Sequence, residues 1–289
     1  MSTSHPAPEC EATIGGLRVR LAEARAAGRT VGFVPTMGFL HAGHCSLVEQ
    51  ARAENDLVVV SIFVNPLQFN PGEDFEDYPR DLNRDLEMCA KAGADIAFVP
   101  DTQEMYPEPV ATTVRLGTLA DVLCGASRAG HFDGVATVVA KLFSIMGECS
   151  AYFGEKDFQQ LTIVSRMAAD LSLPVRVVGC PTVREPDGLA LSSRNAYLSE
   201  AERSQAPVLG RALEAGAAQV QCGETDPTAV EAEMASVIAT APLAEIDYTA
   251  AVSASTLIAD GPLRGDVRLL VAVRFGKARL IDNIGCRAG

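Results

Sequence analysis

The 289-residue sequence lacks any apolar run long enough to cross a membrane as a helix. Residues 57–64 form one of its longest apolar stretches, which is far shorter than the roughly 20 residues that a membrane-spanning helix needs. The N-terminus also lacks the basic segment and apolar core of a secretory signal peptide. These absences predict a soluble chain with no membrane partner and a cytoplasmic location.

Basic charge is also scarce in this sequence. The chain has 24 Lys and Arg residues against 37 Asp and Glu residues, which gives a formal net charge of −13. A charge of this sign repels phosphate backbones, so it argues against nucleic acid as a partner. Four of the basic residues are lysines, and any lysine in a candidate site is therefore informative.

Short apolar runs alternate with amphipathic patterns from residue 30 to about residue 183. Gly, Pro or Asn bounds each run, and the runs predict strands at residues 31–35, 57–64, 95–100, 150–153 and 175–178. Helices are predicted between them at residues 46–53, 82–92, 134–146 and 158–171. This alternation is typical of an α/β fold with a parallel sheet, whose ligands bind beyond the carboxyl ends of the strands.

The pattern changes after residue 184 to two helices followed by three strands. Ser199 and Glu202 predict a capping box at the first helix, and Asp226 with Pro227 predicts the start of the second. The strands are expected at residues 246–252, 267–275 and 278–281, with Gly276 turning the last pair. We therefore predict a Rossmann-like N-terminal domain over residues 1–183 and a smaller α+β C-terminal domain over residues 184–289.

Two of the four histidines lie in the loop after the first predicted strand. His41 and His44 end the sequence PTMGFLHAGH, directly before a predicted helix. A helix N-terminus presents unpaired amide donors and positive partial charge, so it favours phosphate, and two imidazoles add donors there. Gly43 lets the backbone approach a ligand closely. The pattern favours a nucleotide phosphate site, while a partial metal pair and a cap of the turn are the alternatives.

Polar side chains also follow the second and fourth predicted strands. Gln68 is a candidate substrate contact because an amide both donates and accepts, although a polar turn around Pro66 explains the segment equally well. Lys156 lies at the head of a helix, where it can reach a phosphate. Asp157 and Gln160 beside it also fit a simple helix cap.

Two further loops contain candidate residues. Ser192, Ser193 and Arg194 follow the fifth predicted strand and would clamp the outer phosphates of a triphosphate, unless the loop is only a Ser-rich lead into a helix. His131 precedes the third helix. We expect it to border the substrate pocket, and a structural role with Asp133 as the helix cap is the alternative.

Six motifs occur in order along the chain: PTMGxLHxGH, VNPxQF, GHFDGVATVVAKLF, FGEKDxQQ, LSSRN and RLIDN. Together they resemble the pantothenate synthetase (pantoate–β-alanine ligase) family over roughly residues 12–285, and six motifs in sequence are far more specific than any one of them. The resemblance implies an enzyme that joins pantoate to β-alanine through an enzyme-bound pantoyl adenylate, with ATP cleaved to AMP and pyrophosphate. It also implies magnesium as a cofactor and a homodimer.

The resemblance implies roles for individual residues. His44 would be the catalytic proton donor, with His41 and Lys156 assisting at the phosphates. Gln68 and Gln160 would hold pantoate, and Gln68 would also lie near β-alanine. The loop of residues 184–195 would bring part of the ATP site from the smaller domain. The residues implied for ATP are Met37, Gly38, Phe39, Leu40, His41, Ala42, Gly43, His44, Gly154, Glu155, Lys156, Asp157, Val183, Leu191, Ser192, Ser193 and Arg194.

Some positions depart from the family pattern or stay unassigned. Leu191 stands where the family commonly has Met, which roughly conserves volume, and Phe39 stands where a smaller residue is common. Neither position supplies a charge or a proton. Asp77, Asp81 and Asp85 are candidate carboxylates near a metal, and the sequence does not choose among them.

Two other functions remain as alternatives. A different nucleotidyltransferase with an H-x-G-H loop would keep the nucleotide on its product, and the paired Gln68 and Gln160 argue against it. A non-catalytic nucleotide-binding or RNA-binding relative of aminoacyl-tRNA synthetases is disfavoured by the charge of −13 and the lack of a basic C-terminal domain. The presence of both histidines and Lys156 also argues against it.

Overall fold

The computed structural model describes residues 6–70, 75–76 and 78–289. The chain divides into two compact units. The first unit comprises the described residues up to Ala120 together with Arg128–Glu155 and Gln160–Pro181. The second comprises Asp121–Ser127, Lys156–Gln159 and Thr182–Gly289, so two short segments from within the α/β region group with the C-terminal part of the chain.

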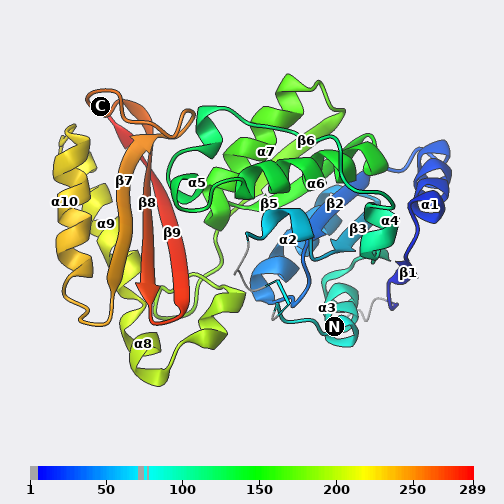
Figure 1. Ribbon diagram of the computed structural model, residues 1–289, viewed down its shortest axis with the longest axis horizontal. Helices are drawn as coiled ribbons and strands as arrows, with labels where there is room; N and C mark the ends of the chain where they lie inside the picture. Colours follow the sequence, from blue (N-terminus) through cyan, green and yellow to red (C-terminus); the bar gives the residue numbers. More distant parts are fainter. Residues whose placement is uncertain (1–5, 71–74, 77) are drawn as a thin grey trace. The chain divides into compact units, whose positions relative to one another are not determined.

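A six-stranded parallel sheet forms the centre of the first unit (Figure 1). Its strand order is β1-β4-β3-β2-β5-β6, so the chain moves from β2 toward one edge and then returns to pair β5 with the other side of β2. Ligands of open α/β sheets bind beyond the carboxyl ends of the strands at such a reversal. The strands are β1 (Glu9–Glu11), β2 (Val31–Thr36), β3 (Leu57–Ile62), β4 (Ile96–Phe98), β5 (Cys149–Gly154) and β6 (Val175–Cys180).

Helices cover both faces of this sheet, which explains why its central strands are apolar on both sides. Phe33 and Val59 pack in one buried cluster with residues of α1, α6 and α7. Val34 and Val58 pack in another with residues of α2 and α3. The α/β prediction is confirmed. The helices are α1 (Ile14–Ala26), α2 (Ala42–Glu54), α3 (Leu82–Ala92), α4 (Thr102–Met105), α6 (His131–Met146) and α7 (Phe158–Asp170).

Two predicted helix starts differ from the structure. Helix α2 begins at Ala42 and not at residue 46, because the side chain of His41 caps it. Helix α6 begins at His131, with Gly130 at the N-cap position in a left-handed conformation (φ 81°). The interpretation of Asp133 as a helix cap is therefore wrong. Asp133 lies inside the first turn, and its Oδ1 accepts a hydrogen bond from the amide of Leu116 at 3.2 Å.

The second unit has a three-stranded antiparallel sheet in the order β7-β8-β9. Helices α9 and α10 pack their apolar residues against it in one buried cluster. The predicted capping box of Ser199 and Glu202, and the cap of Asp226 with Pro227 in the first turn, are confirmed. The elements are α5 (Cys124–Ser127), α8 (Glu200–Gln205), α9 (Val208–Gln221), α10 (Pro227–Ile238), β7 (Glu245–Ser253), β8 (Gly265–Phe275) and β9 (Ala278–Ala288).

Two features of the second unit differ from the prediction. The first predicted helix is divided into α8 and α9, with Pro207 at the N-cap position of α9. Strand β9 extends to Ala288, seven residues beyond the predicted end at residue 281. None of the helices in the described part of the chain is long and apolar enough to cross a bilayer.

Candidate active site

The loop after β2 is held in an unusual conformation by one buried carboxylate. Gly38 and Phe39 both have positive φ, at 84° and 51°, which is unfavourable for the phenylalanine. The two carboxylate oxygens of Asp85, on α3, accept the amides of Phe39 at 2.8 Å and Leu40 at 2.7 Å. A Cβ at position 38 would lie 2.9 Å from Asp85 Oδ2, so this position requires glycine. The guanidinium of Arg84 lies 5.0 Å from the centroid of the Phe39 ring.

His41 and His44 cap the N-terminus of α2 reciprocally. Nδ1 of His41 accepts the amide of Gly43 at 3.1 Å, and Nδ1 of His44 accepts the amide of His41 at 3.3 Å. A backbone amide can only donate, so both Nδ1 atoms act as acceptors and the neutral rings carry their hydrogen on Nε2. The ring centroids are 4.0 Å apart. The predicted turn cap is thus confirmed, and the cap also fixes two Nε2–H donors beside each other at a helix N-terminus.

The segment after β3 brings Gln68 and Met37 together. Residues Pro66–Gln68 form a 3₁₀ turn that Asn65 caps by accepting the amide of Leu67. Gln68 Nε2 donates to Met37 Sδ at 2.9 Å, and Gln68 Oε1 accepts from Asn65 Nδ2 at 3.2 Å. The polar turn expected around Pro66 is therefore present. It places the Gln68 amide beside Met37, in the loop between β2 and α2 that contains His41 (the histidine loop).

Helix α6 supports this turn from behind. A Cβ at Gly134 would lie 2.1 Å from the carbonyl oxygen of Leu67, so the approach requires glycine. His131 Nδ1 lies 2.7 Å from the carbonyl oxygen of Gln68, and Arg128 Nη1 lies 2.9 Å from His131 Nε2. A carbonyl only accepts and a guanidinium only donates, so His131 carries its hydrogen on Nδ1. His131 therefore fixes the backbone of Gln68.

The remaining predicted residues are divided between the two units. Gly154, Glu155 and Gln160 belong to the first unit, where the chain passes from β5 toward α7. Glu155–Asp157 form a 3₁₀ turn, so Lys156 precedes α7 by two residues. The predicted residues in the second unit are Lys156, Asp157, Val183, Leu191, Ser192, Ser193 and Arg194.

Lys156 and Ser192 line one pocket of the second unit, of about 210 Å³ including its open mouth. The pocket follows a hairpin in which the amide of Leu191 donates to the carbonyl of Val183 at 3.0 Å. Ser192 Oγ accepts the amide of Arg194 at 3.2 Å and starts a 3₁₀ turn. Asn195 and Asp282 also line the pocket. Lys156, Ser192 and Asn195 offer donors to this small hollow, and the Asp282 carboxylate that also lines it is paired with Arg184.

Asn195, Asp282 and Asn283 lie in the motifs LSSRN and RLIDN, but sequence reasoning gave none of them a role. Asn195 Oδ1 is buried without a hydrogen-bond partner among the described residues, although Asn195 Nδ2 donates to the carbonyl of Ala190 at 3.1 Å. Asp282 and Asn283 are 2% and 3% exposed in a strand. The signal that could have found this pair is a charged and an amide residue interrupting the apolar run of β9.

The carboxylates proposed near a metal have structural roles in the described residues. Asp81 Oδ1 caps α3 by accepting the amide of Arg84 at 3.1 Å, and Asp85 holds the histidine loop. Asp77 lies outside the described residues. The described part of the chain contains no cluster of three or more His, Cys, Asp or Glu side chains that could hold a metal. Mg²⁺ commonly binds through substrate phosphates with only one or two protein carboxylates, so its binding does not require a cluster of three protein ligands.

Burial raises the pKa of Asp85, against the lowering effect of the bonds from the amides of Leu40 and Phe39. Both oxygens nonetheless accept amide hydrogens, and the carboxylate holds the loop most effectively when ionised. Metal ligation by Asp85 would compete with these two bonds. We therefore assign Asp85 to the loop conformation.

Comparisons with known proteins agree with this architecture. Residues 10–285 match the family model described as pantoate-beta-alanine ligase. The chain is 52% identical over 271 residues to the pantothenate synthetase of Geobacillus kaustophilus (strain HTA426), covering 94% of this chain and 90% of the relative. It is 53% identical over 272 residues to that of Sinorhizobium medicae (strain WSM419), covering 94% of each.

Solved structures give the same result. Pantothenate synthetase from Thermus thermophilus matches with a TM-score of 0.90 and 50% identity, over 96% of this chain and 98% of that one. Pantoate-beta-alanine ligase from Francisella tularensis, complexed with beta-gamma ATP and beta-alanine, matches with a TM-score of 0.78 and 34% identity, over 96% and 97%. The chain therefore belongs to the pantoate–β-alanine ligase family.

Proposed function

We propose that this enzyme condenses (R)-pantoate with β-alanine to form pantothenate. ATP is cleaved to AMP and pyrophosphate, and pantoyl adenylate is the enzyme-bound intermediate. The observation that carries the proposal is the reciprocal cap of His41 and His44, which holds two imidazoles beside each other at the N-terminus of α2. The family membership of the chain supports the same reaction.

The adenylation step joins two anions, so the site must offset their charge. The pantoate carboxylate attacks the α-phosphate of ATP, and negative charge develops on the phosphate oxygens as pyrophosphate leaves. Nε2–H groups of His41 and His44 would donate to the α-phosphate, and the positive end of the α2 dipole would favour its charge. Lys156, Ser192, Ser193 and Arg194 would hold the departing pyrophosphate. No side-chain nucleophile is needed, because the substrate carboxylate itself attacks.

The other proposed contacts follow the family resemblance. Met37 to His44, Gly154 to Asp157, Val183 and Leu191 to Arg194 would form the ATP site. Gln68 and Gln160 would bind pantoate, and Gln68 would also border β-alanine. The Francisella tularensis relative that is complexed with beta-gamma ATP and beta-alanine supports ATP and β-alanine as ligands.

Magnesium, oligomeric state and location complete the proposal. Mg²⁺ would neutralise phosphate charge when bound, and Asp81 and Asp85 are already engaged by backbone amides. We propose a homodimer in the cytoplasm, with a catalytic domain over residues 1–183 and a smaller domain from residue 184. Nucleic acid is not a proposed partner, because the formal net charge is −13.

An isotope experiment tests the reaction directly. Pantoate labelled with oxygen-18 in its carboxylate is supplied with ATP, with and without β-alanine, and the products are analysed by mass spectrometry after a single turnover. Pyrophosphate release without the amine, followed by labelled AMP when the amine is added, is the expected result. Unlabelled AMP, or stoichiometric ADP, would refute the adenylate. A released product that still carries the nucleotide after β-alanine is added would indicate a different nucleotidyltransferase.

A further inference from the structure

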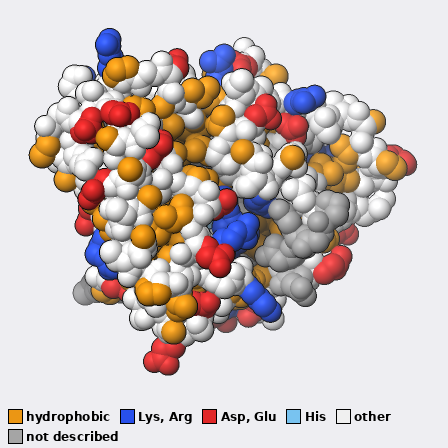
Figure 2. All heavy atoms as spheres, turned by 60° about the vertical axis from the view of Figure 1, so that its left-hand side comes forward, with side chains coloured by type: hydrophobic (Ala, Val, Ile, Leu, Met, Phe, Trp, Pro, Cys, Tyr) orange, Lys and Arg blue, Asp and Glu red, His pale blue; other side chains and the backbone are white. Residues whose placement is uncertain are grey.

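Strand β9 of the second unit buries two consecutive polar residues, whose side chains leave opposite faces of the strand. Asp282 and Asn283 are 2% and 3% exposed, and their strand neighbours in β8 are Val271 and Leu270. Burying a carboxylate and an amide costs free energy unless their polar atoms are bonded. The partners of these two side chains therefore indicate what they do. Most charged side chains need no such partners because they face solvent. On the face drawn in Figure 2, acidic and basic side chains are scattered among apolar and uncharged ones.

Asn283 binds the backbone of Lys156. Its Nδ2 donates to the carbonyl oxygen of Lys156 at 2.8 Å, and its Oδ1 accepts from Arg268 Nε at 2.6 Å. A carbonyl can only accept and a guanidinium can only donate, so the two partners fix the orientation of the amide. The guanidinium carbon of Arg268 lies 3.9 Å from the ring centroid of Phe158, two residues after Lys156. Asn283 thus contacts the residue before Asp157, and Arg268 contacts the residue after it.

Asp282 fixes a second part of the pocket that Lys156 and Ser192 line. Arg184 donates to its two carboxylate oxygens at 2.6 and 2.9 Å, and to the carbonyl of Gly188 at 3.0 Å. Arg184 starts the hairpin that leads to Ser192. Lys156, Ser192 and Asp282 all line the pocket, so the buried pair fixes the backbone on two of its sides.

We propose that Asn283 is a positioning residue for the adenylation step, which holds the backbone of Lys156 so that its ammonium meets the phosphate of ATP. The inference rests on the proposed function. A lysine side chain is long and flexible, so the position of its ammonium depends on the backbone that carries it. Misplacing a catalytic group by about 1 Å can cost about 100-fold in rate.

The variant Asn283→Asp separates the two bonds of the amide. Its carboxylate still accepts from Arg268, but an oxygen replaces the nitrogen that donates to Lys156. We expect a lower melting temperature, because the new oxygen faces the carbonyl of Lys156, and in the folded variant a fall of about 10 to 100-fold in single-turnover pyrophosphate release from labelled ATP with pantoate. The KM for pantoate should change little. Arg287→Ala, at an exposed position of the same strand, is the control and should leave both quantities unchanged.

A double-mutant cycle with Lys156→Ala distinguishes positioning from other effects. If Asn283 acts through Lys156, Asn283→Asp should slow the Lys156→Ala enzyme by less than twofold. A negative charge that simply repels ATP, or a damaged strand, would slow both backgrounds by the same factor and would overturn the inference. If Asn283→Asp does not fold, Asn283→Ser enters the same cycle.

The failure of the inference differs from the failure of the proposed function. A wild-type enzyme that releases no pyrophosphate from ATP and pantoate would refute the function. A wild-type enzyme that is active, with a folded Asn283→Asp variant within threefold of its rate, would refute the positioning role alone. The same holds if Lys156→Ala itself is fully active.

Discussion

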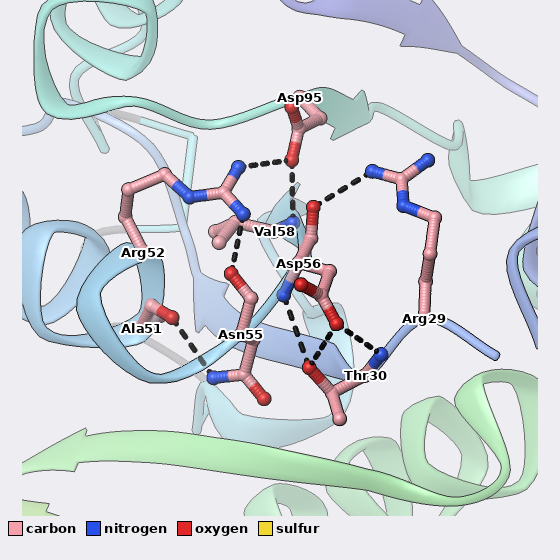
Figure 3. Close-up of polar contacts among 8 residues, drawn as sticks. All are labelled: Arg29, Thr30, Ala51, Arg52, Asn55, Asp56, Val58 and Asp95. Carbon is pink, nitrogen blue, oxygen red and sulfur yellow. Dashed lines mark hydrogen bonds and ion pairs between the residues drawn. The ribbon is translucent and has the colours of Figure 1, made fainter.

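The two ends of the parallel sheet use similar polar side chains for different purposes. At the amino end, Thr30, Asp56 and Asp95 directly precede β2, β3 and β4 and bind backbone or side-chain groups of their neighbours (Figure 3). At the carboxyl end, His41 and His44 also bind backbone amides, but each ring has a second nitrogen that the cap does not use. A polar side chain whose groups all bind the protein only stabilises the backbone. A side chain with a second polar atom can also bind a ligand.

The amino end shows the purely structural case. Asp95 Oδ2 accepts from Arg52 Nη1 and from the amide of Val58, each at 2.7 Å. Thr30 donates its amide and its hydroxyl to Asp56 Oδ2 at 2.9 and 2.8 Å, and the amide of Asp56 donates back to Thr30 Oγ1 at 3.0 Å. Substitutions here should therefore change stability, and those at the carboxyl end should change activity.

His44 should show the largest effect on activity. His44→Ala should lower adenylate formation by about 100 to 1,000-fold, the usual loss when one donor to a developing oxyanion is removed. His44→Asn is the sharper variant, because its Oδ1 can still accept the amide of His41 while the Nε2–H donor is lost. We expect it to be as inactive as the alanine variant but nearly as stable as the wild type. Pyrophosphate release and thermal melting measure the two effects.

A result in which His44→Asn retains activity within threefold would break the comparison. It would mean that the cap, and not the second nitrogen, is what the reaction needs. The histidines would then belong with the structural residues of the amino end.

Gln68 should show a smaller and more selective effect. Gln68→Ala removes an amide whose loss leaves pantoate groups unpaired, at about 1 to 3 kcal/mol each. Calorimetry should therefore show weaker pantoate binding and nearly unchanged ATP binding. Gln68→Glu is the matched control for size, and its charge should weaken the binding of the pantoate anion further. An equal loss of ATP affinity in Gln68→Ala would place this residue elsewhere.

Much of this comparison could be anticipated from the sequence. The apolar runs of β2, β3, β5 and β6 are long enough to predict a parallel sheet, whereas β1 (Glu9–Glu11) has no apolar residue run and forms through its pairing with β4. The spacing of His41 and His44 indicated a phosphate site, a cap or a partial metal pair, but their tautomers depend on which amide each Nδ1 accepts. Local capping contacts of this kind carry no periodic pattern.

Strand β9 shows the same limit in another form. Its predicted end at residue 281 follows the apolar pattern, which Asp282 interrupts. The strand continues because backbone pairing with β8 does not need an apolar side chain, and because Arg184 compensates the buried carboxylate. The side-chain hydrogen bond to Asp282 raises the pKa of Arg184, so the guanidinium stays charged.

Asp95 should show a stability effect without an activity effect. Asp95→Ala leaves the amide of Val58 and the guanidinium of Arg52 without this acceptor, and a lost bond of this kind costs about 1 to 3 kcal/mol. Urea unfolding should report the change, and pyrophosphate release by the folded enzyme should stay within twofold. Asp95→Asn keeps one acceptor oxygen for Val58 and should recover part of the stability. A large loss of turnover in folded Asp95→Ala would show that the two ends are coupled.

Acid should lower the free energy of unfolding by protonating Asp56 at the amino end of the sheet. This is the smallest expected effect. The backbone hydrogen bond from Thr30, followed by its side-chain bond, lowers the pKa of Asp56. Between this lowered pKa and the ordinary value, the unfolded chain binds more protons than the folded one, so stability rises with pH. The contribution is complete above the ordinary value and is lost as pH falls through the lowered pKa.

The variant Asp56→Asn does not titrate and isolates this contribution. Its loss of stability relative to the wild type should be largest at neutral pH and should shrink as the pH falls through the window. Asp85 at the carboxyl end has the opposite sign, because burial raises its pKa and its ionisation disfavours folding as pH rises through the raised value. Urea unfolding at a series of pH values measures both trends. A difference between Asp56→Asn and wild type that is constant with pH would show that the carboxylate charge does not strengthen the bonds with Thr30.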